Sequence, residues 1–293
     1  YYYRRHKNSY HIQNEKSYSE TVKAQLSKSG IQNFIKYREL YKDLEKEQYV
    51  VSKSKEDSPL RILMLIDALN IGGTEMYVLE LAKSLEKLGA HVIIGTSGGP
   101  LVEVFKHYEL KVVKIPFTSD YISNKNIMKL IKLTKKIIDE EKINLLHCHL
   151  FASMRLGNDI YRSYKIPYIV TLHGLFYPND ILFLSCINAA KIIAVSEPIK
   201  KQIQSKLGSR IRGEIVVIPN GIDMENFHPQ HTVKNLTNQL GIPENSQVIT
   251  YCSRLDWGKT LAAEAFIFAC YILMNKNKHL HAFVIGDGAD KNL

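Results

Sequence analysis

From residue 60 onward, short apolar runs rich in β-branched residues alternate with longer stretches of helical periodicity. The runs include RILMLIDAL, AHVIIGTS, INLLHCHL and PYIVTLHG, and amphipathic stretches such as TEMYVLELAKSLEKLG lie between them. Strands that are apolar along most of their length are typical of a parallel sheet covered by helices on both faces. The pattern predicts an α/β protein in which residues 60–222 form one doubly wound, Rossmann-like domain.

This alternation is interrupted after residue 222 and then resumes. Residues 223–245 are polar, contain two prolines and are predicted to connect two domains through a short helix. Residues 246–293 again hold two strand-like runs around a helical stretch. Because two strands and one helix cannot bury a core by themselves, we expect a second α/β domain that is truncated in this chain.

Residues 1–59 differ in character and are predicted to be a basic helical extension. An amphipathic helix over residues 31–44 would pack on the main domain through its apolar stripe. The opening YYYRRHK also has the aromatic and basic character of the cytoplasmic flank of a membrane helix. The 293-residue sequence holds no run of about 18 apolar residues that would span a bilayer.

Charge and cysteine content narrow the classes of partner. The formal net charge of +10 favours an anionic partner, which could be nucleotide phosphates, an acidic membrane or nucleic acid. Cys148, Cys186, Cys252 and Cys270 are widely spaced, lie in apolar stretches and form no CxxC pair. They indicate neither a zinc site nor a disulfide framework, and we expect buried, reduced thiols.

Candidate ligand-binding residues follow the strands of the first domain, where open parallel sheets bind ligands. Gly72 and Gly73 open a helix, so that backbone N–H groups could approach a phosphate or sugar, although a tight turn is the alternative. His147, His149 and His173 also end strands, and the spacing of the first two places them on one face. Structural hydrogen bonding is their alternative role, and no ligand spacing favours a metal.

The segment CSRLDWGKT ends like a phosphate-binding loop but carries Ser253 where that pattern needs glycine. It therefore does not predict a P-loop hydrolase. Arg254 and Lys259 instead fall at the carboxyl edge of the first strand of the second domain. Two cations there suit a diphosphate, because a guanidinium grips two phosphate oxygens while an ammonium acts as a point charge.

Seven motifs occur in one order: IGGTE, LLHCHL, TLHG, AVSEPIKKQI, VIPNGID with Phe227 and Pro229 after it, SRLDWGK and VIGDGAD. Over residues 60–293 this set resembles family four of the retaining GT-B glycosyltransferases. The resemblance implies two Rossmann-like domains that face a cleft, with the acceptor on the N-terminal side and a nucleotide-sugar on the C-terminal side. It implies no bound metal or other cofactor, since cations and helix dipoles would supply the charge.

The resemblance also implies roles for individual residues. His173 would lie beside the reacting sugar, and Arg254 and Lys259 would hold the donor diphosphate and stabilise it as it leaves. Glycines would let the backbone approach the donor phosphates or the acceptor, and the nucleotide base or ribose. These are Gly72 and Gly73 for the first contact and Gly286 and Gly288 for the second. Residues expected on the acceptor side are Thr74, Glu75, His147 and His149.

Three departures from the family pattern are visible. Thr260 stands where the family usually has glycine, and Ala289 stands where proline is common. The family's paired glutamates belong to a later part of the second domain, which this sequence does not contain. The 293-residue chain is therefore expected to lack catalytic activity by itself.

The predicted function is retaining transfer of a hexose from a UDP- or GDP-linked donor to a glycan or lipid-linked acceptor of the cell envelope. The expected location is cytoplasmic, peripheral at or anchored to the inner face of the membrane, with an anionic membrane surface as a further partner and no nucleic acid.

Two alternatives remain. One is a sugar epimerase of the same architecture, for which we see no convincing set of acid/base carboxylates. The other is a non-catalytic basic protein that binds anionic membrane or nucleic acid. Its basis is a lysine-rich amphipathic helix, with Lys125, Lys129, Lys132, Lys135 and Lys136.

Overall fold

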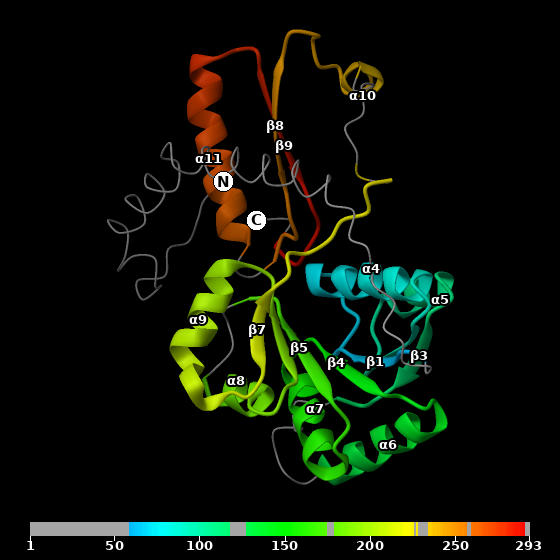
Figure 1. Cartoon of the computed structure of the whole chain (residues 1–293). Coiled ribbons are helices and arrows are strands. Elements are labelled where there is room, and N and C mark those ends of the chain that lie inside the picture. The colour runs from blue at the N-terminus through cyan, green and yellow to red at the C-terminus, as the bar shows by residue number, and fades with distance from the viewer. Residues whose placement is uncertain are drawn as a thin grey trace. The chain divides into compact units, whose positions relative to one another are not determined.

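A computed structural model gives the fold of the chain (Figure 1). It describes residues 59–117, 127–174, 179–225, 227, 234–256 and 259–290, which all belong to one compact unit, Pro59–Leu293. The helix predicted over residues 31–44 and the membrane-flank hypothesis for the first residues lie outside the described residues. The predicted boundaries at residues 59, 222 and 245 stay predictions.

Seven strands form one parallel sheet in the order β3-β2-β1-β4-β5-β6-β7. The order reverses between β1 and β4, which pair in the register Leu65↔Cys148, and this reversal is the mark of a doubly wound sheet. The sequence prediction of such a sheet is confirmed. The strands are β1 Arg61–Leu65, β2 His91–Thr96, β3 Lys111–Lys114, β4 Leu145–Cys148, β5 Tyr168–Leu172, β6 Lys191–Ala194 and β7 Glu214–Val217.

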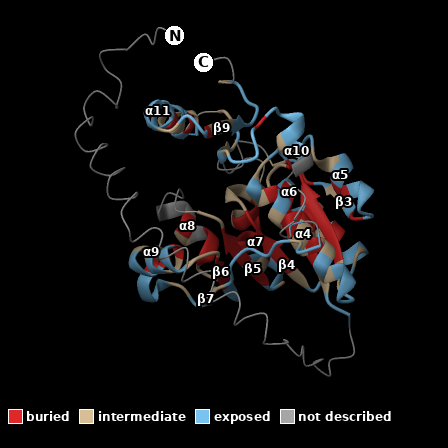
Figure 2. Cartoon of the chain, turned by 90° about the horizontal axis from the view of Figure 1, so that it is seen from above, coloured by how far each residue is buried: buried red, intermediate tan, exposed pale blue. Residues whose placement is uncertain are grey.

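Helices cover both faces of this sheet because alternate strand residues point to opposite sides. Ile62 and Met64 pack in one buried cluster with side chains of α4 and α5, whereas Leu63 and Leu65 pack in another with side chains of α6 to α9. Figure 2 shows that the strands are largely buried. The helices are α4 Gly73–Lys87, α5 Val102–His107, α6 Ile127–Glu140, α7 Phe151–Tyr164, α8 Asn179–Cys186 and α9 Glu197–Leu207, followed by the short 3₁₀ turn η2 Gly208–Arg210.

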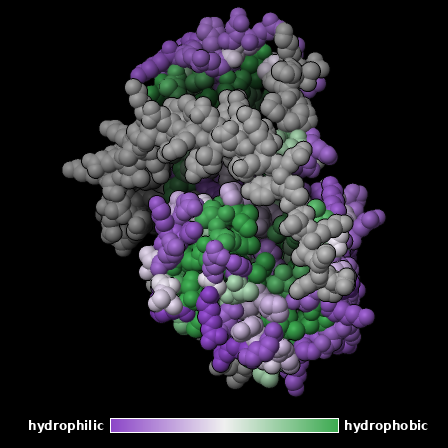
Figure 3. Space-filling view, in the orientation of Figure 1, coloured by the Kyte–Doolittle hydropathy of each residue, from purple (hydrophilic) through white to green (hydrophobic). Residues whose placement is uncertain are grey.

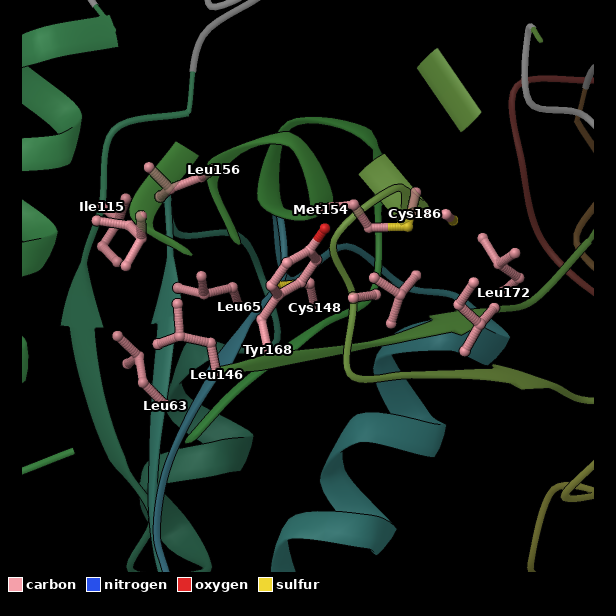
Figure 4. Packing of buried hydrophobic residues seen from close by; sticks show 14 of the residues in the cluster. Leu63, Leu65, Ile115, Leu146, Cys148, Met154, Leu156, Tyr168, Leu172 and Cys186 are labelled. Carbon is pink, nitrogen blue, oxygen red and sulfur yellow. The ribbon is translucent and has the colours of Figure 1, made fainter. Parts of the chain in front are cut away.

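Close packing of α7 on the sheet depends on Gly157. A Cβ on this glycine would lie 2.6 Å from Cys148 Sγ and 2.9 Å from the ring of Tyr168. Tyr168 is fully buried and donates a hydrogen bond from its hydroxyl to the Ser185 carbonyl at 2.9 Å. Figure 4 shows Tyr168 among the side chains of the buried cluster that joins the sheet to helices α6 to α9.

A second, two-stranded parallel sheet is formed by β8 Gln247–Cys252 and β9 Leu280–Ile285, joined by α11 Thr260–Lys276. The short helix predicted for the connection is α10 Lys234–Gln239. Phe268 and Tyr271 on α11 are both 66% exposed, and Figure 3 shows hydrophobic side chains at the surface of this region. The small sheet carries the βαβ beginning of a Rossmann-like arrangement.

The cysteine prediction is correct for three thiols and wrong for one. Cys148, Cys186 and Cys270 are buried and free, but Cys252 is exposed. Cys252 ends a strand whose residues alternate between half-buried and exposed, because few of the described residues cover that face. None of the described helices combines the length and the apolar character needed to cross a bilayer.

Candidate active site

The first part of the site is the N-terminus of α4. Gly72 is the N-cap residue, and its backbone is extended with φ −169°. A Cβ there would lie 2.6 Å from Glu75 Oε2, so Gly72 leaves room for a carboxylate of its own chain. A Cβ on Gly73 would meet no described atom within 4 Å. Of the two glycines, Gly73 therefore has open space beside it for a ligand.

The carboxylate of Glu75 lies at the N-terminus of α4, where the sequence analysis predicted a bound ligand. Burial raises the pKa of its carboxyl, and hydrogen bonds from the backbone N–H groups of Glu75 and Asn70 and the positive charge of Arg254 act in the opposite direction. Thr74 lies beside it, half-buried in the first turn. A carboxylate bound to helix-end N–H groups is stabilised by the helix dipole, as an incoming phosphate would be.

Three histidines form the second part of the site, at the carboxyl edge of β4 and β5. His147 Nε2 lies 2.7 Å from Thr171 Oγ1, and His149 Nδ1 lies 3.3 Å from His173 Nε2. The rings of His147 and His149 are 4.1 Å apart between centroids, which confirms that the two side chains share a face. The structure thus brings together all three histidines that the sequence singled out.

These imidazoles are neutral at pH 7. Burial lowers the pKa of His147 to about 3 and of His173 to about 4, and it lowers the pKa of His149 well below the usual value. Each ring therefore has one N–H donor and one acceptor lone pair. Among the described residues, no group of His, Cys, Asp or Glu side chains is arranged to hold a metal ion.

Two residues of this edge were missed by the sequence analysis. Tyr77, one turn into α4, has its ring edge-on to His173 at 4.9 Å and to His149 at 5.9 Å between centroids. Asp67 accepts hydrogen bonds from the Ala152 and Ser153 N–H groups at 3.0 and 2.8 Å, and burial raises its pKa. Asp67 could have been noticed, because it is a carboxylate directly after an apolar strand.

The Arg254 loop is the third part. Arg254 donates a hydrogen bond from Nη1 to the Ile71 carbonyl at 3.2 Å, so its guanidinium lies at the start of α4. Its Nε is 3.4 Å from Asp256 Oδ2, and its side chain is about half exposed. Lys259 is exposed at the N-cap of α11, and its carbonyl accepts a hydrogen bond from the Tyr251 hydroxyl.

Gly286 and Gly288 lie against this loop. A Cβ on Gly286 would be 1.9 Å from the Ser253 carbonyl oxygen, and one on Gly288 would be 2.0 Å from that of Leu255. Hydrogen bonds from the Ser253 N–H to the Ile285 carbonyl and from the Leu255 N–H to the Asp287 carbonyl join the two segments. Close backbone packing accounts for both glycines, and their contact with a nucleotide stays a prediction.

A groove of about 310 Å³ runs along one face of α4 and is closed by residues 221–225, which contain the end of the PNGID motif. Tyr77 lines this groove and also touches His173, so the groove adjoins the histidines. The sequence analysis did not identify it. Its lining residues are Tyr77, Glu80, Leu81, Lys83, Ser84, Lys87, Gly221, Ile222, Asp223, Met224 and Glu225.

The lysine-rich helix considered for membrane binding is α6. Its apolar stripe, which includes Leu130, Ile131 and Ile138, is buried against the sheet. Lys135 and Lys136 are near Asp139 and Glu140 respectively, so part of the positive charge is offset within the helix. This apolar face is occupied by the protein's own core, which removes the main sequence argument for α6 as a membrane-binding helix.

Comparison with known proteins places the chain in a family and a fold. The model of Glycosyltransferase Family 4 matches residues 71–226. An uncharacterized glycosyltransferase of Methanocaldococcus jannaschii is 29% identical over 53% of this chain and 44% of its own length. Alpha-monoglucosyldiacylglycerol synthase of Acholeplasma laidlawii is 26% identical over 75% and 61%, respectively. The chain spans roughly half the length of these relatives.

Solved structures agree on the fold. A crystal structure of Anabaena HepE in complex with UDP and glucose is similar with a TM-score of 0.60 and 20% identity, over 78% of this chain and 61% of that one. Sucrose-phosphate synthase from Thermosynechococcus elongatus gives a TM-score of 0.55 and 18% identity, over 78% and 70%. The architecture is that of GT-B glycosyltransferases. Because the family model matches more than half of its residues, the chain belongs to Glycosyltransferase Family 4.

Proposed function

We propose that this chain belongs to an enzyme that transfers a hexose from a UDP- or GDP-linked donor to a glycan or lipid-linked acceptor of the cell envelope. The observation that carries the proposal is the position of Arg254, whose guanidinium is hydrogen-bonded to the Ile71 carbonyl at the start of α4. A cation, a helix N-terminus and the open space beside Gly73 together suit a diphosphate.

The proposed chemistry follows from the charge that develops as the donor breaks down. The departing nucleoside diphosphate gains negative charge, which Arg254 and Lys259 would stabilise together with the N-terminal N–H groups of α4. The sugar would pass through an oxocarbenium-like transition state and keep its anomeric configuration. His173, a neutral donor or acceptor, would lie beside the sugar, and Gly286 and Gly288 beside the base or ribose.

Acceptor binding is assigned to the groove along α4. Tyr77 connects this groove to His173, which would place a bound acceptor next to the reacting sugar. Thr74, Glu75, His147 and His149 remain proposed residues of this side. Two relatives support a lipid-linked acceptor by name: the synthase from Acholeplasma, and a UDP-Gal:alpha-D-GlcNAc-diphosphoundecaprenol alpha-1,3-galactosyltransferase of Escherichia coli that is 27% identical over 67% of this chain. We accordingly propose that the enzyme works at the inner face of the membrane and needs no metal.

Substitution of Arg254 tests this proposal. In the complete gene product, Arg254→Ala should lower turnover by about 10²- to 10³-fold, as expected for loss of one preorganised charge stabiliser. Lys259→Ala should act in the same direction. Lys132→Ala is the matched control, because it removes an exposed positive charge on α6, away from the α4 N-terminus. An Arg254→Ala variant with unchanged turnover would remove Arg254 from the mechanism.

The same assay separates transfer from epimerisation. A transferase releases nucleoside diphosphate only as the acceptor gains a sugar, whereas an epimerase alters the sugar while it stays on the nucleotide. Conversion of a nucleotide-sugar without acceptor, and without release of nucleoside diphosphate, would therefore favour the epimerase. The 293-residue chain is proposed to be inactive by itself, and addition of the paired glutamates on a longer product should restore turnover.

A further inference from the structure

The histidines at the carboxyl edge of β4 and β5 take part in two side-chain contacts between these neighbouring strands. His147 on β4 pairs with Thr171 on β5, and His149 and His173, which directly follow these strands, pair with each other. The ring of His149 is also held on two sides, by His147 at 4.1 Å and by Tyr77 at 5.9 Å between centroids. His149 therefore has little freedom to turn away from His173.

The contact between His149 Nδ1 and His173 Nε2 requires one proton between two nitrogens. Both rings are neutral at pH 7, since burial lowers the pKa of each. Two arrangements satisfy this requirement. In the first, His149 Nδ1–H donates to His173 Nε2 and His173 carries its own proton on Nδ1. In the second, His173 Nε2–H donates to His149 Nδ1 and His149 carries its proton on Nε2.

The surroundings of His149 Nε2 distinguish the two arrangements. This nitrogen is fully buried and has no hydrogen-bond partner among the described residues. In the second arrangement it would be a buried N–H donor without an acceptor, and in the first it is only an unused lone pair. Unpaired buried donors are the rarer case in folded proteins and carry a desolvation penalty. The first arrangement is favoured.

We infer that His149 is a positioning residue that holds His173 in the tautomer with its proton on Nδ1. His173 then offers an N–H donor from the nitrogen that His149 does not engage, and cannot act as a base through that nitrogen. If the proposed function holds, this donor serves a hydroxyl of the bound sugar. His149 would thus act on the substrate through His173, rather than as a direct acceptor contact.

The tautomer can be measured by NMR on the 293-residue chain labelled with ¹⁵N-histidine, independently of any enzyme activity. Signals of His173 among the eleven histidines are identified by their loss in His173→Gln. At pH 7 we expect the His173 proton on Nδ1. A proton on Nε2 in the unaltered chain would overturn the inference, and unchanged signals of the histidines that do not contact His173 would show that His173→Gln folds.

Variants of His149 test whether this residue sets the tautomer of His173. His149→Phe removes the donor and should give His173 a mixture of tautomers, whereas His149→Asn keeps an amide donor near the Nδ1 position and should restore the original one. Thr171→Val is the comparison variant, since it removes the hydrogen bonds of Thr171 with His147 and Tyr77 but alters neither residue of the His149–His173 pair. An unchanged His173 tautomer in His149→Phe would contradict the role given to His149.

Binding of UDP-glucose and of UDP to the complete gene product provides the second readout. Loss of one hydrogen bond to the sugar should weaken UDP-glucose binding to His149→Phe by about 3- to 10-fold, with less than about twofold change for UDP. Equal weakening of both ligands would refute the link from His149 to the sugar. Absence of binding of both UDP- and GDP-linked sugars to the complete gene product would contradict the proposed function, while the tautomer measurement would still decide the role of His149.

Discussion

The two regions that carry candidate site residues hold them in opposite ways. At the β4–β5 edge the polar groups are neutral, buried and hydrogen-bonded to one another, and His147 and His149 are at most 3% exposed. On the Arg254 loop the groups are charged and exposed, next to a sheet of only two strands. The histidines are thus part of a core, whereas the cations are supported mainly by backbone packing.

Because of this difference, the same kind of substitution should have different consequences in the two regions. Changes near the histidines are expected to lower the free energy of unfolding, in addition to any effect on ligand binding. Changes on the Arg254 loop are expected to affect ligand binding with a small effect on the seven-stranded sheet. Four substitutions or conditions test this contrast, in order of decreasing free-energy effect.

Tyr168→Ala should have the largest effect on stability, about 3–5 kcal/mol, because it opens a large cavity in the buried cluster between the seven-stranded sheet and helices α6 to α9. Tyr168→Phe should cost about 1–3 kcal/mol, because the Ser185 carbonyl then loses a buried donor. The matched change in the other region is Tyr251→Phe, where the lost bond to Lys259 is exposed and should cost less than about 0.5 kcal/mol. Urea unfolding of the three variants measures these values, and equal costs for the two Tyr→Phe changes would break the comparison.

Gly286→Ala should come next, at about 1–3 kcal/mol, because the new Cβ overlaps the Ser253 carbonyl and the backbone must move. The loss of stability should appear as faster amide hydrogen exchange in β8 and β9, with exchange in β1 to β7 unchanged. UDP binding should also become weaker. Gly73→Ala is the contrasting variant: its Cβ meets open space, so stability should hold while UDP binding weakens. A lower stability of Gly73→Ala would mean that Gly73 is required for folding and not for ligand binding.

Acidification should destabilise the histidine region. The folded pKa values lie below the unfolded value near 6.5, at about 3 for His147 and about 4 for His173. The unfolded chain therefore binds more protons between pH 6.5 and 4, and stability falls as pH falls through this window. The slope approaches about 1.4 kcal/mol per pH unit for each histidine. The raised pKa values of Asp67 and Glu75 act in the opposite direction at the acid end.

Unfolding of the chain and of His147→Phe at pH 7 and pH 5.5 measures this dependence. Removal of one histidine should reduce the loss of stability between pH 7 and pH 5.5 by about 1.2 kcal/mol, whatever the change in stability at pH 7. A variant with the full slope would show that His147 titrates normally in the folded protein.

Phe268→Ala should have the smallest effect, within about 0.5 kcal/mol, because its side chain is 66% exposed on α11. A cost above about 2 kcal/mol would mean that this face is covered in solution. Thermal unfolding at two protein concentrations would then show whether a second copy provides the cover. That result would mean that the two regions differ less in burial than the exposure of α11 indicates.

Much of the fold could be predicted from the sequence because its signals are local. The nearly continuous apolar runs and the helical stretches between them predicted the parallel, doubly wound sheet, and its carboxyl edge predicted where His147, His149 and His173 would meet. The motif order predicted the family, which the match over residues 71–226 confirms. The prediction that Cys252 is buried was wrong because it relied on this local pattern alone. The exposure of Cys252 depends on which residues cover β8, and the strand pattern does not contain that information.

Other features were decided only in three dimensions. The sequence placed Gly72 near a ligand, but the structure fills that space with Glu75, and it places the Ser253 and Leu255 carbonyls against Gly286 and Gly288. The pairing of His149 with His173, and the edge-on ring of Tyr77, join residues that are far apart along the chain. The spacing of apolar residues along a segment indicates which face of a helix or strand is buried, because residues on that face recur at a fixed interval in the sequence. Which two side chains touch, and which nitrogen carries the proton, depends on distances between segments that no local pattern contains.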